Sequence, residues 1–299
     1  MHKDYAERAC IALVLFPTGD TVGAVNDSQQ ALIGNHPGFD QAREAADVLA
    51  ERLDCPRHDI GVVLGSGWAH TIDSLGEVTG EVSFDQVPGL GQDGVAGHVQ
   101  KISSVRLPDG RQALVFGSRT HYYASRDTQA VAHVVRTIAA TGAATVVLTN
   151  GCGGLDPQLQ PGTPVLISDH INLTGTTPLV GAEFVDMTDA YSKRLRTIAK
   201  QVDPSLTEGV YVQFAGPQYE TPAEVAMAGT LGGDLVGMST ALDTIAARHA
   251  GLEVLGISLV TNAGAGVTDA PLSHEDVIAA GESAAPRVSK LLADIIHAI

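Results

Sequence analysis

Four short segments of the chain combine glycine with polar side chains of the kinds that bind anions and hydroxyl groups. In order they read LGSGW (64–68), GSRTHYYAS (117–125), TNGCGG (149–154) and GMSTALD (237–243). Glycine lets backbone N–H groups face an anion, and the Ser66 hydroxyl adds a further donor. A tight turn explains any one of these glycines equally well. Only the four segments together favour an anion site.

The second segment carries a permanent cation. Arg119, His121 and Tyr123 alternate, so an extended backbone points a guanidinium, an imidazole and a phenol to one side. Such a row suits an anion and a sugar hydroxyl. The alternative is an edge strand with a polar face.

The fourth segment places Met238 and Ser239 before a helix that Thr240 can cap, with Asp243 three residues on. The N-terminus of a helix attracts anions. A methionine at such a position is more often a core residue than a ligand contact. In the third segment, Cys152 is interpreted as a buried packing residue, because the neighbouring sequence supplies no histidine partner.

Glu220 is a carboxylate that its local structure does not require. In YVQFAGPQYETPAEVAM (211–227), Thr221 suits the N-cap of a helix, Pro222 the first helical position and Glu224 a capping box. Glu220 is left in a loop at the carboxyl end of a strand, where open α/β sheets bind their ligands. The alternative is a solvated loop carboxylate.

These loops require a framework of alternating strands and helices. Apolar runs predict strands that begin near residues 60, 145, 163, 210, 234 and 253. The strand from Thr145 is expected to end at Thr149, before a glycine turn. Helical patterns lie between them, and Val131, Val134, Val135 and Ile138 share one face. A final helix is expected from about Ser273. The alternation predicts one α/β domain with a central, mostly parallel sheet flanked by helices.

The composition of the chain argues against some classes of binding partner. The chain has 299 residues, with 34 acidic against 18 basic side chains and a net charge of −16. Such a charge argues against nonspecific nucleic-acid or anionic-membrane binding. The three cysteines lie far apart, which suggests neither a zinc site nor a disulfide framework, and a reducing cytoplasm fits best. Residues 1–36 are interpreted as a poorly specified extension of a domain spanning 37–299.

The order of the segments GSG, GH, RTHYY, TNGCGGL, SDHINLTG, GPQYET, GMST and SLVTN resembles the trimeric purine nucleoside phosphorylase family. The resemblance runs from about Phe39 to the carboxyl end. It implies a single-domain phosphorylase-type fold with a central mixed sheet, assembled as a homotrimer. It also implies reversible phosphorolysis of 6-oxopurine ribonucleosides or deoxyribonucleosides, such as inosine and guanosine, in purine salvage. Phosphate is then a co-substrate, with no metal or organic cofactor.

The resemblance also implies roles for individual residues. Phosphate is expected to bind to Ser66, His98, Arg119, His121, the Gly151 backbone and Ser239. The ribose is expected to contact Tyr123, Met238 and His274, and Phe184 from a neighbouring subunit. The base is expected to contact Tyr219, Glu220 and Asn262, and the implied catalytic residues are Asn262, Glu220 and His98. Family members often carry phenylalanine in place of Tyr219 and alanine in place of Gly151.

The chemistry suits these side chains. Cleavage of a glycosidic bond leaves positive charge on the ribose and negative charge on the purine, and a catalyst should stabilise both. Phosphate held by Arg119 supplies the anion, Asn262 can donate to the purine N7, and ionised Glu220 accepts from N1–H. The alternatives are a hydrolytic nucleosidase, a methylthioadenosine phosphorylase of the same architecture, and an inactive nucleoside-binding scaffold.

Overall fold

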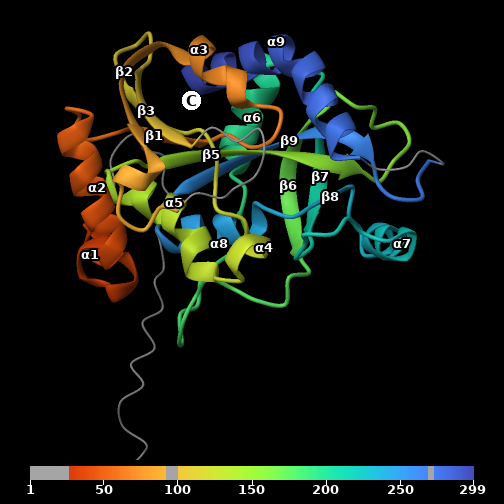
Figure 1. Ribbon diagram of the computed structural model, residues 1–299, viewed down its shortest axis with the longest axis horizontal. Helices are drawn as coiled ribbons and strands as arrows, with labels where there is room; N and C mark the ends of the chain where they lie inside the picture. Colours follow the sequence, from red (N-terminus) through yellow and green to blue (C-terminus); the bar gives the residue numbers. More distant parts are fainter. Residues whose placement is uncertain (1–26, 92–99, 269–272) are drawn as a thin grey trace, which may run out of the picture.

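A computed structural model describes residues 27–91, 100–268 and 273–299 (Figure 1). The helices are α1 (Asp27–Asn35), α2 (Asp40–Arg52), α3 (Ile72–Leu75), α4 (Tyr122–Ser125), α5 (Thr128–Ala140), α6 (Lys193–Val202), α7 (Pro222–Thr230), α8 (Ala241–His249) and α9 (His274–Ala298). The strands are β1 (Ile60–Val63), β2 (Glu77–Ser83), β3 (Lys101–Arg106), β4 (Gln112–Phe116), β5 (Thr145–Gly154), β6 (Pro164–Asn172), β7 (Thr207–Gln213), β8 (Leu235–Gly237) and β9 (Glu253–Ala263). Short 3₁₀ turns at Pro37–Phe39, Ala69–Thr71 and Phe84–Gln86 complete the described elements.

The described strands form one mixed sheet in the order β2-β3-β4-β1-β5-β8-β7-β6-β9. Parallel ladders join β4, β1, β5 and β9, and others join β6, β7 and β8. Antiparallel ladders join β2–β3–β4, β5–β8 and β6–β9. Because β5 also pairs with β9, strands β5 to β9 close on themselves. The predicted mixed, mostly parallel sheet is confirmed.

Helices cover both faces of this sheet. Figure 1 shows α3, α6 and α9 on one side, and α5 and α8 on the other. Neighbouring strand residues point to opposite faces, so Val63 packs in the core cluster with α5 and α8, whereas Val62 packs in the cluster with α6 and α9. The predicted apolar face of α5 is buried, with Val131 3% exposed and Val134, Val135 and Ile138 fully buried.

The amino-terminal part of the described chain joins this core. Helix α1 falls within the segment interpreted as an extension, yet its Ile33 is 8% exposed and packs in the core cluster beneath α2 and α5. The described part of that segment is therefore helical and docked at Ile33. No helix in the described ranges is long and apolar enough to cross a membrane.

Two local expectations are corrected. The strand expected to end at Thr149 continues to Gly154, because β5 pairs with β9 along its whole length and with β8 at its end. A Cβ on Gly153 would lie 3.1 Å from Val236 Cγ2, so glycine allows β8 to approach. The extended run expected around Tyr123 is instead α4, a single helical turn.

Candidate active site

A cavity of about 350 Å³ lies where the carboxyl ends of several strands meet. Its lining includes residues from the ends of β5 and β9 and from the loops after β1, β4, β7 and β8. The predicted site residues that it brings together are Ser66, Arg119, His121, Tyr123, Gly151, Tyr219, Glu220, Met238, Ser239 and Asn262. Segments up to two hundred residues apart in the chain thus converge on one hollow.

The loop after β1 is pressed against β5 by its glycine. The Gly65 N–H donates to Thr149 Oγ1 over 3.0 Å, and a Cβ on Gly65 would come within 2.5 Å of Thr149 O. A side chain at this position would push the loop away from the strand. Gly65 thereby sets Ser66 at the cavity wall, beside Gly151.

Gly151 allows the same close approach from the opposite side. A Cβ there would lie 3.3 Å from Ser66 Cβ and 3.2 Å from Thr261 Cγ2. The alanine common in the resembled family therefore needs neighbours displaced by a few tenths of an ångström. Cys152 also lines the cavity, but burial raises the pKa of its thiol to about 12. The thiol stays protonated at neutral pH, which supports a packing role over a nucleophile.

His121 and Tyr123 stack on each other although α4 replaces the extended run. Their ring centroids lie 4.9 Å apart with an interplanar angle of 16°. His121 occupies the N-cap position of α4, and Tyr123 lies within its single turn. Both rings line the cavity as predicted.

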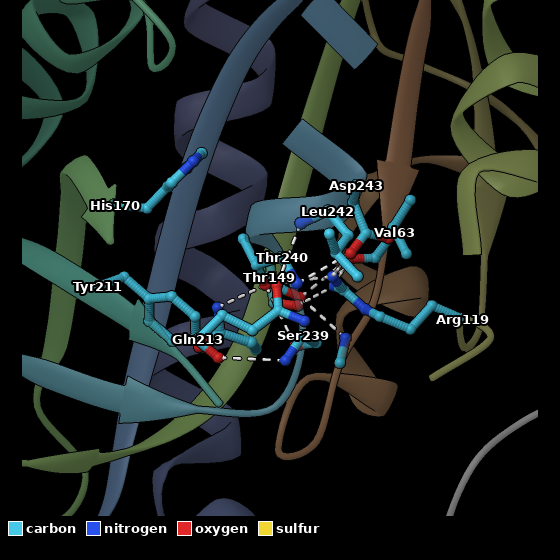
Figure 2. Close-up of polar contacts among 12 residues, drawn as sticks. Val63, Arg119, Thr149, His170, Tyr211, Gln213, Ser239, Thr240, Leu242 and Asp243 are labelled. Carbon is cyan, nitrogen blue, oxygen red and sulfur yellow. Dashed lines mark hydrogen bonds and ion pairs between the residues drawn. The ribbon is translucent and has the colours of Figure 1, made fainter. Parts of the chain in front are cut away.

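Arg119 is almost completely buried and is surrounded by oxygen atoms (Figure 2). Its Nη1 lies 3.2 Å from Thr240 Oγ1 and 3.5 Å from Asp243 Oδ2. Its Nη2 donates to Thr149 O and lies 3.5 Å from Val63 O. The guanidinium is thus fixed at the cavity wall by β1, β5 and the start of α8.

The β8–α8 corner holds Ser239 at the cavity through an unusual backbone. Thr240 has φ +83°, a conformation that β-branched residues rarely adopt. Its Oγ1 accepts from Asn150 Nδ2 at 2.9 Å, and its N–H donates to Asp243 Oδ2 at 2.8 Å. These contacts hold the strained residue in place, so the hydroxyl of Ser239 and the N-terminus of α8 have fixed positions.

Glu220 is buried directly before the N-cap residue of α7. The predicted capping box is confirmed, because Thr221 Oγ1 accepts from the Glu224 N–H at 3.2 Å and Glu224 Oε2 accepts from the Thr221 N–H at 2.7 Å. Glu220 takes no part in the box. It is 9% exposed, its Oε1 is buried without a hydrogen-bond partner, and burial raises its pKa above the ordinary glutamate value. The solvated-carboxylate alternative is therefore wrong.

Asn262 lies near the end of β9, with its amide oriented by its neighbours. Its Oδ1 accepts from Thr261 Oγ1 at 2.9 Å, and its Nδ2 donates to Ala263 O at 2.8 Å. An amide nitrogen has a second N–H to offer. Glu220 and Asn262 thus place an acceptor and a donor on the wall of one cavity.

The described residues do not place the remaining three predicted side chains in this cavity. His98 lies outside the described residues, and the same holds for the side chain of His274, which begins α9. Phe184 is 67% exposed and does not line the cavity of its own chain.

The sequence interpretation missed the ion pair behind the cavity. It gave Asp243 a capping position only, whereas the carboxylate also faces Arg119, and both side chains are 1% exposed. The pairing joins positions more than a hundred residues apart, and no local pattern in either segment indicates it. Spacing also did not reveal the cluster of His36, Glu183 and His249, whose ligand-type atoms lie within 4.8 Å of one another.

That cluster is better described by hydrogen bonds than as a metal centre. Glu183 Oε1 contacts His36 Nε2, and its Oε2 lies 2.9 Å from His249 Nε2. His36 Nδ1 accepts from the Gly38 N–H at 3.0 Å, so in the neutral ring the proton is on Nε2, the nitrogen that would have to bind the metal. His249 Nδ1 has no partner to orient the ring as a ligand.

The sequence of this chain is similar to those of known proteins. The family described as the phosphorylase superfamily matches residues 59–297. The chain is 59% identical over 258 residues to a purine nucleoside phosphorylase of Cellulomonas sp, covering 85% of this chain and 92% of that protein. It is 54% identical over 255 residues to a purine nucleoside phosphorylase of Mycobacterium tuberculosis, covering 85% and 95%.

A solved structure with the same fold is purine nucleoside phosphorylase of Schistosoma mansoni in complex with inosine. Its TM-score is 0.78 at 30% sequence identity, covering 87% of this chain and 97% of that chain. The Schistosoma protein has also been solved in complex with adenosine.

Proposed function

Because the chain belongs to the purine nucleoside phosphorylase family of the phosphorylase superfamily, we propose that its cavity cleaves 6-oxopurine nucleosides with inorganic phosphate. The products are the free base and ribose 1-phosphate or its deoxy form, and the enzyme is a pentosyltransferase of purine salvage. The observation that carries the proposal is one cavity whose lining includes a set of anion-binding groups, a buried carboxylate and an amide.

The anion-binding groups come from the loops after β1, β4 and β8 and from β5. Ser66, Arg119, His121 and Ser239 all line the cavity, together with the Gly151 backbone. They combine one permanent cation with neutral donors, which suits a phosphate that must bind and then react. A hydrolytic nucleosidase, which activates water, has less use for this set.

Two further residues of the lining, Glu220 and Asn262, suit a 6-oxopurine. That base presents a donor at N1 and acceptors at N7 and O6. Ionised Glu220 matches the first, and Asn262 can donate to the other two. The buried Oε1 of Glu220 has no hydrogen-bond partner in the described part of the chain, and the N1–H of a 6-oxopurine is a donor that suits such a carboxylate. A 6-aminopurine offers a lone pair at N1, which argues against methylthioadenosine as the substrate.

The reaction then separates charge within the cavity. A phosphate oxygen forms a bond to C1′ as the C1′–N9 bond breaks and its electron pair enters the purine ring. The phosphate anion stabilises the positive ribose, and the Asn262 amide stabilises the electron density that reaches N7. Glu220 holds the base in register through N1–H. His98 is assigned to phosphate and His274 to the ribose 5′-hydroxyl, both from the family resemblance.

The assembly is proposed to be a cytoplasmic homotrimer in which Phe184 covers the ribose of a neighbouring subunit. Its support is that Phe184 and Val180 are 67% and 71% exposed and that Phe184 does not line its own cavity. Large apolar side chains that are exposed in one loop indicate a contact surface. A head-to-tail contact of this kind closes into a ring.

The test is inosine cleavage in buffer with and without phosphate, followed by hypoxanthine release. We expect turnover only with phosphate, and no loss on treatment with a chelator. Undiminished turnover without phosphate would identify a hydrolase, and no turnover in either buffer would favour a binding protein.

A further inference from the structure

Asp243 faces the buried guanidinium of Arg119 (Figure 2) and, unlike Arg119, does not line the cavity. Its Oδ2 lies 3.5 Å from Arg119 Nη1, and both side chains are 1% exposed. Asp243 supplies the cation with a charged partner, because a buried guanidinium facing only neutral oxygens is poorly compensated. The remaining contacts of its terminal nitrogens are to Thr240 Oγ1 and to two backbone carbonyls.

A phosphate that binds Arg119 must compete with protein oxygens for the N–H groups of the guanidinium. The two terminal nitrogens of Arg119 already face four protein oxygens. An incoming phosphate that hydrogen-bonds to either terminal nitrogen must take over one of these positions. The longest contact on Nη1 is the one to Asp243, and Asp243 is the acceptor whose negative charge phosphate duplicates.

One oxygen atom of the Asp243 carboxylate also lacks a hydrogen-bond partner. Its Oδ2 accepts from the Thr240 N–H at 2.8 Å, but its Oδ1 is buried without a hydrogen-bond partner. A helix cap alone needs one oxygen atom and no charge at this depth. The negative charge of Asp243 is therefore explained by its contact with Arg119 rather than by the helix cap.

We propose that Asp243 is an internal counter-anion that competes with phosphate for the Arg119 guanidinium. It neutralises the cation while the cavity is empty and weakens the site for phosphate and for the sugar phosphate product, so that the product leaves. The inference rests on the proposed function, because it takes phosphate as the co-substrate.

Asp243→Asn separates charge from hydrogen bonding. The asparagine oxygen can occupy the place of Oδ2 and accept from the Thr240 N–H, and its nitrogen can occupy the place of the unpartnered Oδ1. The matched control is Asp127→Asn, which also changes a carboxylate that accepts a backbone N–H at the start of a helix, over 2.8 Å, but is exposed.

We expect Asp243→Asn to lower the KM for phosphate roughly tenfold, because the repulsion of two close anions in a protein interior is removed. The KM for inosine should stay near the wild-type value, and kcat should fall as the sugar phosphate product is retained. Asp127→Asn should change none of these. A merely structural role predicts instead that both KM values rise together or that neither changes, and either result would overturn the inference.

Wild-type protein provides a test that does not depend on the variant folding. Crystal structures with and without inorganic phosphate should show the Arg119 Nη1–Asp243 Oδ2 distance increasing when phosphate binds. If Asp243→Asn does not fold, an unchanged distance refutes the exchange. If wild-type turnover does not need phosphate, the proposed function fails. If turnover needs phosphate and Asp243→Asn does not lower its KM, only the inference fails.

Discussion

Replacing Glu220 with glutamine is expected to weaken inosine cleavage and to stabilise the ligand-free protein at the same time. In the empty cavity the carboxylate is 9% exposed and its Oε1 has no partner, so burial raises its pKa. The ionised group is therefore a cost to the fold that only the substrate offsets. Glutamine removes the charge and keeps a carbonyl acceptor of the same shape.

The magnitude follows from the hydrogen bond to the purine N1–H. A bond to a charged group contributes about 1.5–3 kcal/mol, against about 0.5–1.5 kcal/mol for a neutral pair. The difference of about 1–2 kcal/mol corresponds to a loss of roughly 5- to 30-fold in kcat/KM for inosine. Glu224→Gln is the matched control, because it lies four residues away on the same helix start and belongs to the capping box.

The assay compares initial rates of hypoxanthine release with melting temperatures of the free proteins. Glu220→Gln should lose activity and melt at or above the wild-type temperature, whereas Glu224→Gln should melt lower and keep most of its activity. A Glu220→Gln protein with wild-type kcat/KM, or one with a clearly lowered melting temperature, would refute the reasoning.

The raised pKa of Glu220 makes both the activity and the stability of the protein depend on pH. Protonated Glu220 can accept from N1–H only as a neutral group, which makes a weaker bond, so kcat/KM for inosine should fall as the pH drops through the raised pKa of the free enzyme. The contribution of Glu220 to stability has the opposite sign. Because its folded pKa lies above its unfolded value, its favourable contribution is complete below the unfolded pKa and is lost as pH rises through the folded pKa. The Glu220→Gln protein should lack this part of both profiles.

Three further substitutions test the remaining assignments. Asn262→Asp should narrow the preference for inosine over adenosine, on the order of 10⁴-fold in the wild type, since a carboxyl oxygen can accept from a 6-amino group; equal wild-type kcat/KM for the two nucleosides would refute the pairing. Arg119→Ala should raise the KM for phosphate far more than that for inosine, because it removes a permanent charge, and equal effects on both would count against a phosphate role. Phe184→Ala should leave the protein folded and trimeric while turnover falls, and mixing it with a subunit inactive at Glu220 should restore some activity; light scattering that shows an active monomer would exclude sharing.

Much of the fold was predictable because its strands and helix starts are locally encoded. The apolar face of α5 and the capping box of α7 follow from short-range spacing, and both are confirmed. The extent of β5 was not predictable, because the segment 151–154, with glycine at 151, 153 and 154, is typical of a turn. They form strand only because β8 and β9 are close enough to pair with them.

Most of the described residues predicted for the site line one cavity, but the contacts that hold them in place were not predictable. Glu220 stands out in the sequence because the helix start has no use for it, and the structure buries it in the cavity wall. Asp243 does not stand out, because a capping position already explains it. Its contact with Arg119 depends on how the loop after β4 packs against α8, which no local spacing describes.

The central claim is that phosphate, rather than water, receives the pentosyl group. Phosphorus-31 NMR of the wild-type protein with inosine and inorganic phosphate tests it most directly. We expect a sugar phosphate ester to appear in an amount equal to the hypoxanthine released, with an equal loss of inorganic phosphate. Hypoxanthine released alongside free ribose, with the phosphate signal unchanged, would contradict the account.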